Sequence, residues 1–287
     1  MKKWNLVVDV DRCNNCNNCF LAVKDEHGGN DFPGYAAPQP AKGARWFRVE
    51  RQERGVAPMI DASHYPVACN HCDAAPCMNA GTAGVITKRA DGIVLIDPVK
   101  AKGRKDIVGM CPYGHIHWND ELRLPQNWIF EAHLLDQGWK EPRVSQVCPT
   151  GAIEAVKVED AEMAERAARE GLRTLRPELG AKPRIYYRNF YRVDKAFIGG
   201  SLAEIRDGVE DCAEGVELEL WLDGAPLQTT KTDVFGDYKF DGLEPGEGEY
   251  EVRLSHGRTA AGLPATLSLT RSEYLGLRLL DESALTH

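Results

Sequence analysis

Residues 13–19 read Cys-Asn-Asn-Cys-Asn-Asn-Cys, and the only residues before them with a regular pattern are 4–10, WNLVVDV, which alternate like a short strand. Three cysteines separated by two residues each allow one short loop to provide three thiolates to a cubane iron–sulfur cluster. A cubane cluster needs a fourth ligand, which must come from elsewhere in the chain. The stretch therefore predicts a strand that leads into a metal-binding loop.

A second group of cysteines repeats this arrangement. Cys69-Asn-His-Cys72 is followed by Cys77, and two cysteines further along precede proline, at Cys111-Pro112 and Cys148-Pro149. Bacterial ferredoxins combine a cysteine triplet with such a distant Cys-Pro ligand. Two triplets and two distant cysteines provide eight thiolates, which is the number that two four-cysteine sites require. We therefore predict two [4Fe-4S] clusters.

Other interpretations of the cysteines and their neighbours stay open. Two structural zinc sites would also use four thiolates each, but zinc ribbons usually pair two Cys-x-x-Cys arms, so iron–sulfur clusters are favoured. The ninth cysteine, Cys212, is interpreted as a small buried core residue because free cysteines are often buried. His71 and His115 stand beside predicted ligands and are expected to tune the sites by hydrogen bonding, since the thiolate count is complete.

Composition limits the class of protein. The 287 residues are 43% hydrophobic and 27% charged, so the chain can form a hydrophobic core and has room for two or three domains. A net charge of -8 disfavours nucleic-acid binding. No apolar run reaches the roughly 18 residues of a membrane span, and we expect no direct membrane insertion. Cysteine spacing typical of metal thiolates, without a secretory signal, predicts a cytoplasmic location.

These motifs resemble the small iron–sulfur subunits of molybdopterin oxidoreductases of the dimethyl sulfoxide reductase family. Such subunits hold up to four cubane clusters in two fused ferredoxin modules, and the resemblance covers about residues 4–190. It implies that each distant cysteine completes the set of one particular triplet. Cluster A would be held by Cys13, Cys16, Cys19 and Cys148, and cluster B by Cys69, Cys72, Cys77 and Cys111.

The same resemblance implies that two further cluster sites are missing. The family's remaining ligand positions are occupied by other residues, in one module by Gly81, Ala101, Arg104 and Ile107 and in the other by Val23, Trp128, Glu131 and Val144. In the family, each of these groups serves a single cluster. Each module therefore keeps one complete ligand set and lacks one complete set. We expect Val23, Trp128 and Val144, with Phe130 nearby, to fill the vacated volume, because a cavity of that size is destabilising.

A closer resemblance is to the small subunits of pyrogallol–phloroglucinol transhydroxylases and of anaerobic hydroxylases such as resorcinol hydroxylase. It includes Asp25-Glu-His27, Phe32-Pro-Gly-Tyr35, Ala132-His-Leu-Leu-Asp136 and Pro183-Arg-Ile-Tyr-Tyr187. It implies a large catalytic partner subunit, in a heterodimer or a higher oligomer, that binds molybdenum through two molybdopterin guanine dinucleotides. That partner would act on polyhydroxylated aromatic rings in anaerobic metabolism. Those relatives keep the cluster that Val23, Trp128, Glu131 and Val144 replace here.

The fold class that follows is α+β. We predict a double ferredoxin-like iron–sulfur domain over residues 1–158, a helix and extended connector over 159–196, and an antiparallel β-sandwich over 197–287. Alternation in 216–222, 237–240 and 248–254 predicts the strands of this sandwich, and residues 232–246 resemble an immunoglobulin-like or prealbumin-like fold. The helix is expected over 159–171, with Ala161, Ala164, Ala167 and Ala168 on one stripe.

Electron transfer is the chemistry that these residues can support. We find no nucleophile–base arrangement and no nucleotide-binding glycine motif, so the chain is expected to be a non-catalytic subunit without catalytic residues of its own. Two other functions remain open. One is electron transfer in another molybdenum or tungsten enzyme, of the formate, nitrate or sulfur-compound type. The other is a non-redox assembly role in which the clusters only stabilise the fold.

Overall fold

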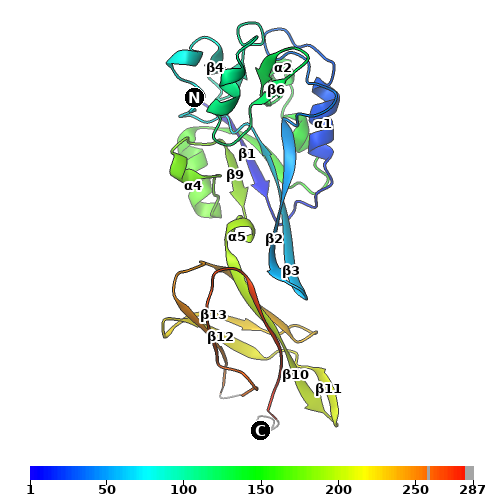
Figure 1. Ribbon diagram of the computed structural model, residues 1–287, viewed down its shortest axis with the longest axis vertical. Helices are drawn as coiled ribbons and strands as arrows, with labels where there is room; N and C mark the ends of the chain where they lie inside the picture. Colours follow the sequence, from blue (N-terminus) through cyan, green and yellow to red (C-terminus); the bar gives the residue numbers. More distant parts are fainter. Residues whose placement is uncertain (257–258, 282–287) are drawn as a thin grey trace. The chain divides into compact units, whose positions relative to one another are not determined.

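The computed structural model describes residues 1–256 and 259–281, and it consists mainly of β-strands with a few short helices (Figure 1). The chain forms two compact units. Residues 1–51 and 63–190 make up the first unit, and residues 52–62 and 191–287 make up the second. Among the residues that the structure describes, no helix combines the length and the apolar character that a membrane crossing requires.

The first unit holds both cysteine triplets and both distant cysteines. Its helices are α1 (Asn18–His27), α2 (Ala132–Asp136), α3 (Arg143–Gln146) and α4 (Asp160–Glu170), with short 3-10 helices at Ala80–Thr82, Lys105–Met110 and Pro177–Leu179. Its strands are β1 (Lys3–Asp9), β4 (Ile86–Lys88), β5 (Val94–Ile96), β6 (His117–Asn119), β7 (Leu124–Gln126), β8 (Ile153–Val158) and β9 (Ile185–Arg188). Strands β2 (Phe47–Val56) and β3 (Met59–Ala68) pair as a hairpin that runs from the first unit into the second.

Strand β1 lies at the centre of a three-stranded sheet with the order β8-β1-β9. It is antiparallel to β8, with Leu6 opposite Ala155, and parallel to β9, with Leu6 opposite Ile185. Leu6 and Val8 are fully buried and Val7 nearly so. The apolar run on β1 is therefore explained by burial on both faces of a central strand. The sheet fixes the strand that leads directly to the first cysteine loop.

The segment after β8 differs from the sequence-based expectation in two ways. Helix α4 forms where it was expected and ends at Gly171, which has a positive φ of 60°. Its buried side chain is Met163, however, whereas Ala161 and Ala164 are exposed, because a methionine buries more apolar area than an alanine. Residues 185–188, expected in an extended connector, form β9 and add a parallel strand to the central sheet.

The second unit contains two four-stranded sheets. Its elements are α5 (Tyr191–Asp194), β10 (Ala196–Arg206), β11 (Val209–Cys212), β12 (Glu217–Leu222), β13 (Ala225–Lys231), β14 (Asp237–Leu243), β15 (Glu249–Leu254), β16 (Ala265–Ser268) and β17 (Glu273–Leu279). One sheet has the order β11-β10-β14, with β17 also paired to β10, and the other has the order β13-β12-β15-β16. The β10–β17 pair is parallel, which the alternating pattern did not reveal.

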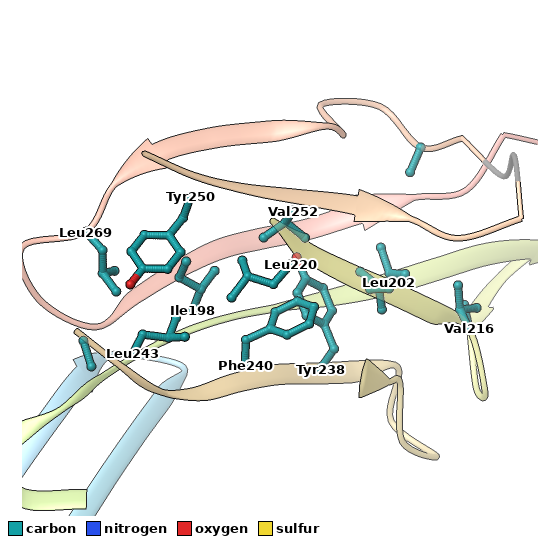
Figure 2. Close-up of a cluster of buried hydrophobic side chains, with 14 of the residues drawn as sticks. Ile198, Leu202, Val216, Leu220, Tyr238, Phe240, Leu243, Tyr250, Val252 and Leu269 are labelled. Carbon is teal, nitrogen blue, oxygen red and sulfur yellow. The ribbon is translucent and has the colours of Figure 1, made fainter. Parts of the chain in front are cut away.

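Alternate residues of both sheets form one hydrophobic core (Figure 2). Ile198 on β10 and Phe240 on β14 come from one sheet, and Leu220 on β12 and Val252 on β15 come from the other. The strands predicted from alternation at 216–222, 237–240 and 248–254 correspond to β12, β14 and β15. Their period of two therefore directs one face of each strand into this core.

A buried arginine stabilises the second unit. The side chain of Arg54 is 6% exposed, and its two terminal nitrogens lie 2.6 Å from Asp61 Oδ2 and 2.6 Å from Asp241 Oδ1. Asp61 also pairs with Arg192. Burial favours the neutral form of Asp61, but the hydrogen bonds from Arg192 and Arg54 outweigh it and lower the pKa of Asp61 to about 2. Its contribution to stability is therefore present above its ordinary pKa and is lost as the pH falls towards 2.

Replacement of Arg54 by alanine is expected to lower the stability of the second unit by about 3 kcal/mol, because two partly buried carboxylates lose a partner. Amide hydrogen exchange of β14 peptides measures this loss. The control is Arg253→Ala, which removes a surface pair with Glu251 and is expected to change little. Equal exchange rates in the two variants would contradict the assignment.

Candidate metal centres

The second cysteine triplet and Cys111 line one small cavity. Cys69 follows directly after β3, and Cys111 follows the 3-10 helix that ends at Met110. The walls between the thiols are largely apolar and come from β4, β5 and the loops around them. The lining residues are Cys69, Asn70, His71, Cys72, Ala75, Pro76, Cys77, Ile86, Val94, Ile96, Cys111, Pro112, Tyr113, Ile116 and Asn127. We call this the B cavity.

The first triplet and Cys148 line a second cavity, the A cavity. Asn15 and Asn17 have positive φ angles of 60° and 61°, so the loop reverses direction between its cysteines, a conformation that asparagine tolerates. The loop then enters α1, which contains Cys19, while Cys148 lies just after α3. Around the thiols, the cavity is lined by Asn14, Asn17, Val49, Pro66, Thr150, Ala152 and Ile153.

The chemistry of these two donor sets fits a cluster that brings its own positive charge. Burial raises the pKa of the Cys69 and Cys72 thiols to about 12, and that of Cys77 to about 11. In the A cavity, burial raises the pKa of Cys19 to about 12. Thiols in such surroundings stay protonated unless a metal compensates the charge of the thiolate, so metal binding would release protons.

The described residues do not offer the geometry that a single bound metal ion requires. Within residues 1–256 and 259–281, no three histidine, cysteine, aspartate or glutamate side chains converge closely enough to hold one metal ion. In a cubane cluster each thiolate binds a different iron atom, so the four sulfur atoms surround the cluster and do not converge on one point. The two cysteine cavities are compatible with that arrangement.

The two histidines beside the ligands take up hydrogen-bonding positions in the B cavity region. His71 is buried, and its Nδ1 accepts a hydrogen bond from the backbone N–H of Val94 at 3.0 Å. The backbone N–H of His115 donates to Cys111 Sγ at 3.4 Å. Lys88 Nζ donates to the carbonyl oxygens of His71 and Cys72 at 2.9 and 3.0 Å, which fixes the loop of the triplet.

Cys212 does not match its sequence-based interpretation. It lies on β11, whose four residues are all exposed and which stands at the edge of its sheet next to β10. An edge strand leaves many of its side chains in solvent, so burial was the wrong expectation for this cysteine. Cys212 belongs to the second unit, whereas the other eight cysteines belong to the first.

The positions that replace the first missing ligand set are closely packed. Ala101 and Ile107 are fully buried, in a hydrophobic cluster with Ile86, Val94 and Ile96. Arg104 Nη2 donates to the carbonyl oxygen of Gly81 at 3.0 Å. Apolar packing and this hydrogen bond therefore occupy the place where the resemblance locates a further cluster.

The other replaced ligand set is also buried. Val23 on α1 and Val144 on α3 are at most 1% exposed, and these two helices pack together. Trp128 is fully buried, its ring centroid lies 4.8 Å from that of Phe130, and its Nε1 donates to Glu131 Oε1 at 2.6 Å. Sequence reasoning treated Glu131 as a lost ligand and did not anticipate a buried carboxyl group. In the sequence, His27 was singled out only as part of the Asp25-Glu-His27 stretch that resembles the related subunits, and its burial was not anticipated.

Comparison of the chain with known proteins shows the family to which it belongs. The model of the 4Fe-4S dicluster domain matches residues 60–158. The chain is 42% identical over 256 residues to the pyrogallol hydroxytransferase small subunit of Pelobacter acidigallici, covering 88% of this chain and 91% of that protein. The chain belongs to the family of iron–sulfur subunits that includes this small subunit, and [4Fe-4S] clusters are its cofactors.

More distant relatives serve other enzymes. The iron-sulfur subunit ArrB of the arsenate respiratory reductase of Shewanella sp. is 24% identical, over 68% of this chain and all of that protein. A sulfite dehydrogenase subunit of Allochromatium vinosum is 28% identical, over 65% of this chain and 83% of that protein. The part of the chain that these relatives share is thus smaller than the part shared with the hydroxytransferase subunit.

Proposed function

We propose that this chain is the electron-transfer subunit of a heteromeric molybdenum enzyme that acts on polyhydroxylated aromatic compounds. The observation that carries the proposal is the pair of four-cysteine cavities in a chain that is 42% identical to a pyrogallol hydroxytransferase small subunit. The catalytic partner would be a large subunit with molybdenum bound by two molybdopterin guanine dinucleotides. This chain would contribute no catalytic residue.

Each cavity would hold one [4Fe-4S] cluster, which stores and passes single electrons when bound. Cys13, Cys16, Cys19 and Cys148 would be the ligands in the A cavity, and Cys69, Cys72, Cys77 and Cys111 those in the B cavity. In the B cavity, Val94 and Ile96 exclude water, and the N–H of His115 lowers the negative charge on Cys111 Sγ. Both effects influence the reduction potential of such a site.

The proposed architecture follows from the two units. Residues 1–158 would form two fused ferredoxin-like modules, with residues 159–196 adding α4 and β9 at one side. Residues 197–287 would form a β-sandwich of the immunoglobulin-like or prealbumin-like type. Two sheets that share one hydrophobic core support this part of the proposal.

We also propose that the chain functions in the cytoplasm. None of the nine cysteines forms a disulfide in the described part of the chain. Thiols persist in a reducing compartment, whereas an oxidising one favours disulfides.

Co-purification of the complex with an affinity tag on this chain tests the function. We expect a large partner subunit, molybdenum, and about eight irons per copy of this chain, since two cubane clusters hold four irons each. Addition of pyrogallol to the oxidised complex is expected to produce the electron paramagnetic resonance signals of reduced clusters. Zinc in place of iron, or a complex without molybdenum, would contradict the proposal. Clusters that stay unreduced during turnover would favour the assembly role.

A further inference from the structure

A buried carboxyl group stands at one of the replaced ligand positions in the first unit. The side chain of Glu131 is fully buried. Its Oε1 accepts the hydrogen bond from Trp128 Nε1, whereas its Oε2 has no hydrogen-bond partner among the residues that the structure describes. A carboxylate with few hydrogen-bond donors is poorly stabilised away from water. Burial, reinforced by the charge of Glu26, raises the pKa of Glu131 to about 8, and the hydrogen bond from Trp128 together with the charge and backbone N–H of Arg143 offsets only part of this effect.

An imidazole without hydrogen bonds lies next to this carboxyl group. His27, at the end of α1, is fully buried, and its Nε2 lies 3.9 Å from Glu131 Oε1. Neither ring nitrogen of His27 has a hydrogen-bond partner within the described part of the chain. The ring packs against Trp46 and Phe32, with centroid distances of 5.0 and 5.3 Å. Burial, reinforced by His133, lowers the pKa of His27 to about 3. Near neutral pH the pair therefore holds one proton, on the carboxyl group.

A chain of titratable groups leads from this pair to the surface. The ring of His133 lies 5.4 Å from that of His27, and His133 Nε2 is 2.8 Å from Glu26 Oε1. Glu26 Oε2 accepts a hydrogen bond from Arg143 at 2.6 Å. Arg143 in turn lies 3.0 Å from Asp25, whose side chain is 73% exposed. Titratable groups from α1, α2 and α3 thus lie one after another between the buried carboxyl group and solvent, with a ring contact and no hydrogen bond between His133 and His27 in the described part of the chain.

On its other side, the pair is connected to the B cavity by packed rings. The ring of Trp128 lies 5.4 Å from that of His71, which lines the B cavity. His71 Nδ1 is 4.0 Å from Cys69 Sγ. In a buried region of low dielectric constant, a charge that arrives in the cavity is less screened from a nearby carboxyl group than it would be in water. The proton of Glu131 and the charge of the cavity are therefore expected to interact.

We propose that Glu131 and His27 form a redox-linked proton site, which takes the place of the lost cluster ligands. The proposal rests on the electron-transfer function proposed above. Above about pH 8, where Glu131 is a carboxylate, entry of one electron into the B cavity from a reduced one-electron donor draws one proton from the solvent to Glu131, past Glu26, His133 and His27. The O–H bond of the Glu131 carboxyl group forms as a bond to hydrogen breaks in a solvent acid, which is left as its conjugate base. Oxidation returns the proton along the same groups.

Thermodynamic linkage between proton binding and reduction determines whether the midpoint potential rises or falls with pH. A negative charge in the B cavity stabilises the protonated form of Glu131, so protonation of Glu131 must make reduction easier by the same factor. The midpoint potential of a cluster in the intact complex is therefore expected to be constant at acid pH. It should fall as the pH rises through about 8, with one proton taken up for each electron.

The test combines redox titration with infrared spectroscopy on the intact complex. Titrations followed by electron paramagnetic resonance, between about pH 6 and about pH 10, give the potentials. The reduced-minus-oxidised infrared difference spectrum at the upper end of this range should contain the band of a protonated carboxylic acid, shifted in deuterated water. This measurement uses the unmodified protein and does not depend on the folding of a variant.

Glu131→Gln keeps an acceptor for Trp128 Nε1 but cannot bind the proton, so it should abolish both the pH dependence and the infrared band. Asp136→Asn is the control, because Asp136 is an exposed carboxylate at the end of α2, paired with Arg89, whereas Glu131 precedes the first residue of that helix, and this variant should preserve both signals. Potentials that do not vary with pH in the unmodified complex, or a pH dependence that survives in Glu131→Gln, would overturn the proposal. The iron content separates this failure from failure of the proposed function, since a complex without clusters gives no potentials to measure.

Discussion

Cys148→Ala is expected to lower the iron content of the purified complex from about eight to about four atoms per copy of this chain. Cys148 lies more than a hundred positions from Cys19 in the sequence, yet both line the A cavity. A cubane cluster with three thiolates loses one iron-binding corner and is released or degraded during purification. Iron analysis and electron paramagnetic resonance measure the loss.

The chain provides a matched control for this experiment. Cys212→Ala removes a cysteine that is exposed on an edge strand of the other unit, and it should leave about eight irons in place. Cys111→Ala should also leave about four irons, but with the spectrum of the other cluster. Unchanged iron in Cys148→Ala, or identical residual spectra in Cys148→Ala and Cys111→Ala, would contradict the two ligand sets.

Phe240→Ala is expected to destabilise the second unit by about 3–5 kcal/mol. Phe240 is 1% exposed and lies in the core between the two sheets, close to Tyr238 and Leu220 (Figure 2). The substitution removes a large apolar side chain and leaves a cavity that strands on both sides cannot close. Amide hydrogen exchange of β12 and β15 peptides reports the loss of stability on the sheet opposite the substitution.

Phe235→Ala is the control, because the same change is made five positions earlier at a side chain that is 71% exposed. We expect its effect to stay within about 0.5 kcal/mol. A comparable loss of stability in both variants would show that the shared core of the two sheets does not hold this unit together.

Cysteine spacing predicted two four-cysteine sites, the family resemblance implied which distant cysteine completes each triplet, and the ligand assignments stay predictions. The triplets and the Cys-Pro pairs indicated eight thiolates, and the structure brings them to two cavities as two groups of four. What spacing could not reveal is the environment of each replaced ligand. Glu131 and His27 are 104 positions apart, and their proximity depends on tertiary packing that places the residue before α2 next to the last residue of α1.

The fold was predictable in strands whose apolar and polar residues alternate, because this alternation indicates that one face of the strand is buried. Strands β12, β14 and β15 alternate over most of their length, and each faces a core on one side. Pairing between strands that are distant in the sequence could not be predicted from the sequence pattern. The parallel pairs β1–β9 and β10–β17 join distant segments, and nothing local in Ile185–Arg188 distinguishes a strand of the central sheet from an extended connector.

The central claim is that each cysteine triplet is completed by one particular distant cysteine. Anomalous diffraction at the iron absorption edge, from crystals of the intact complex, tests it most directly. We predict two iron clusters in this chain, one bonded to Cys13, Cys16, Cys19 and Cys148 and the other to Cys69, Cys72, Cys77 and Cys111. Iron bonded to Cys111 together with the first triplet, or a single zinc ion in either cavity, would contradict the account.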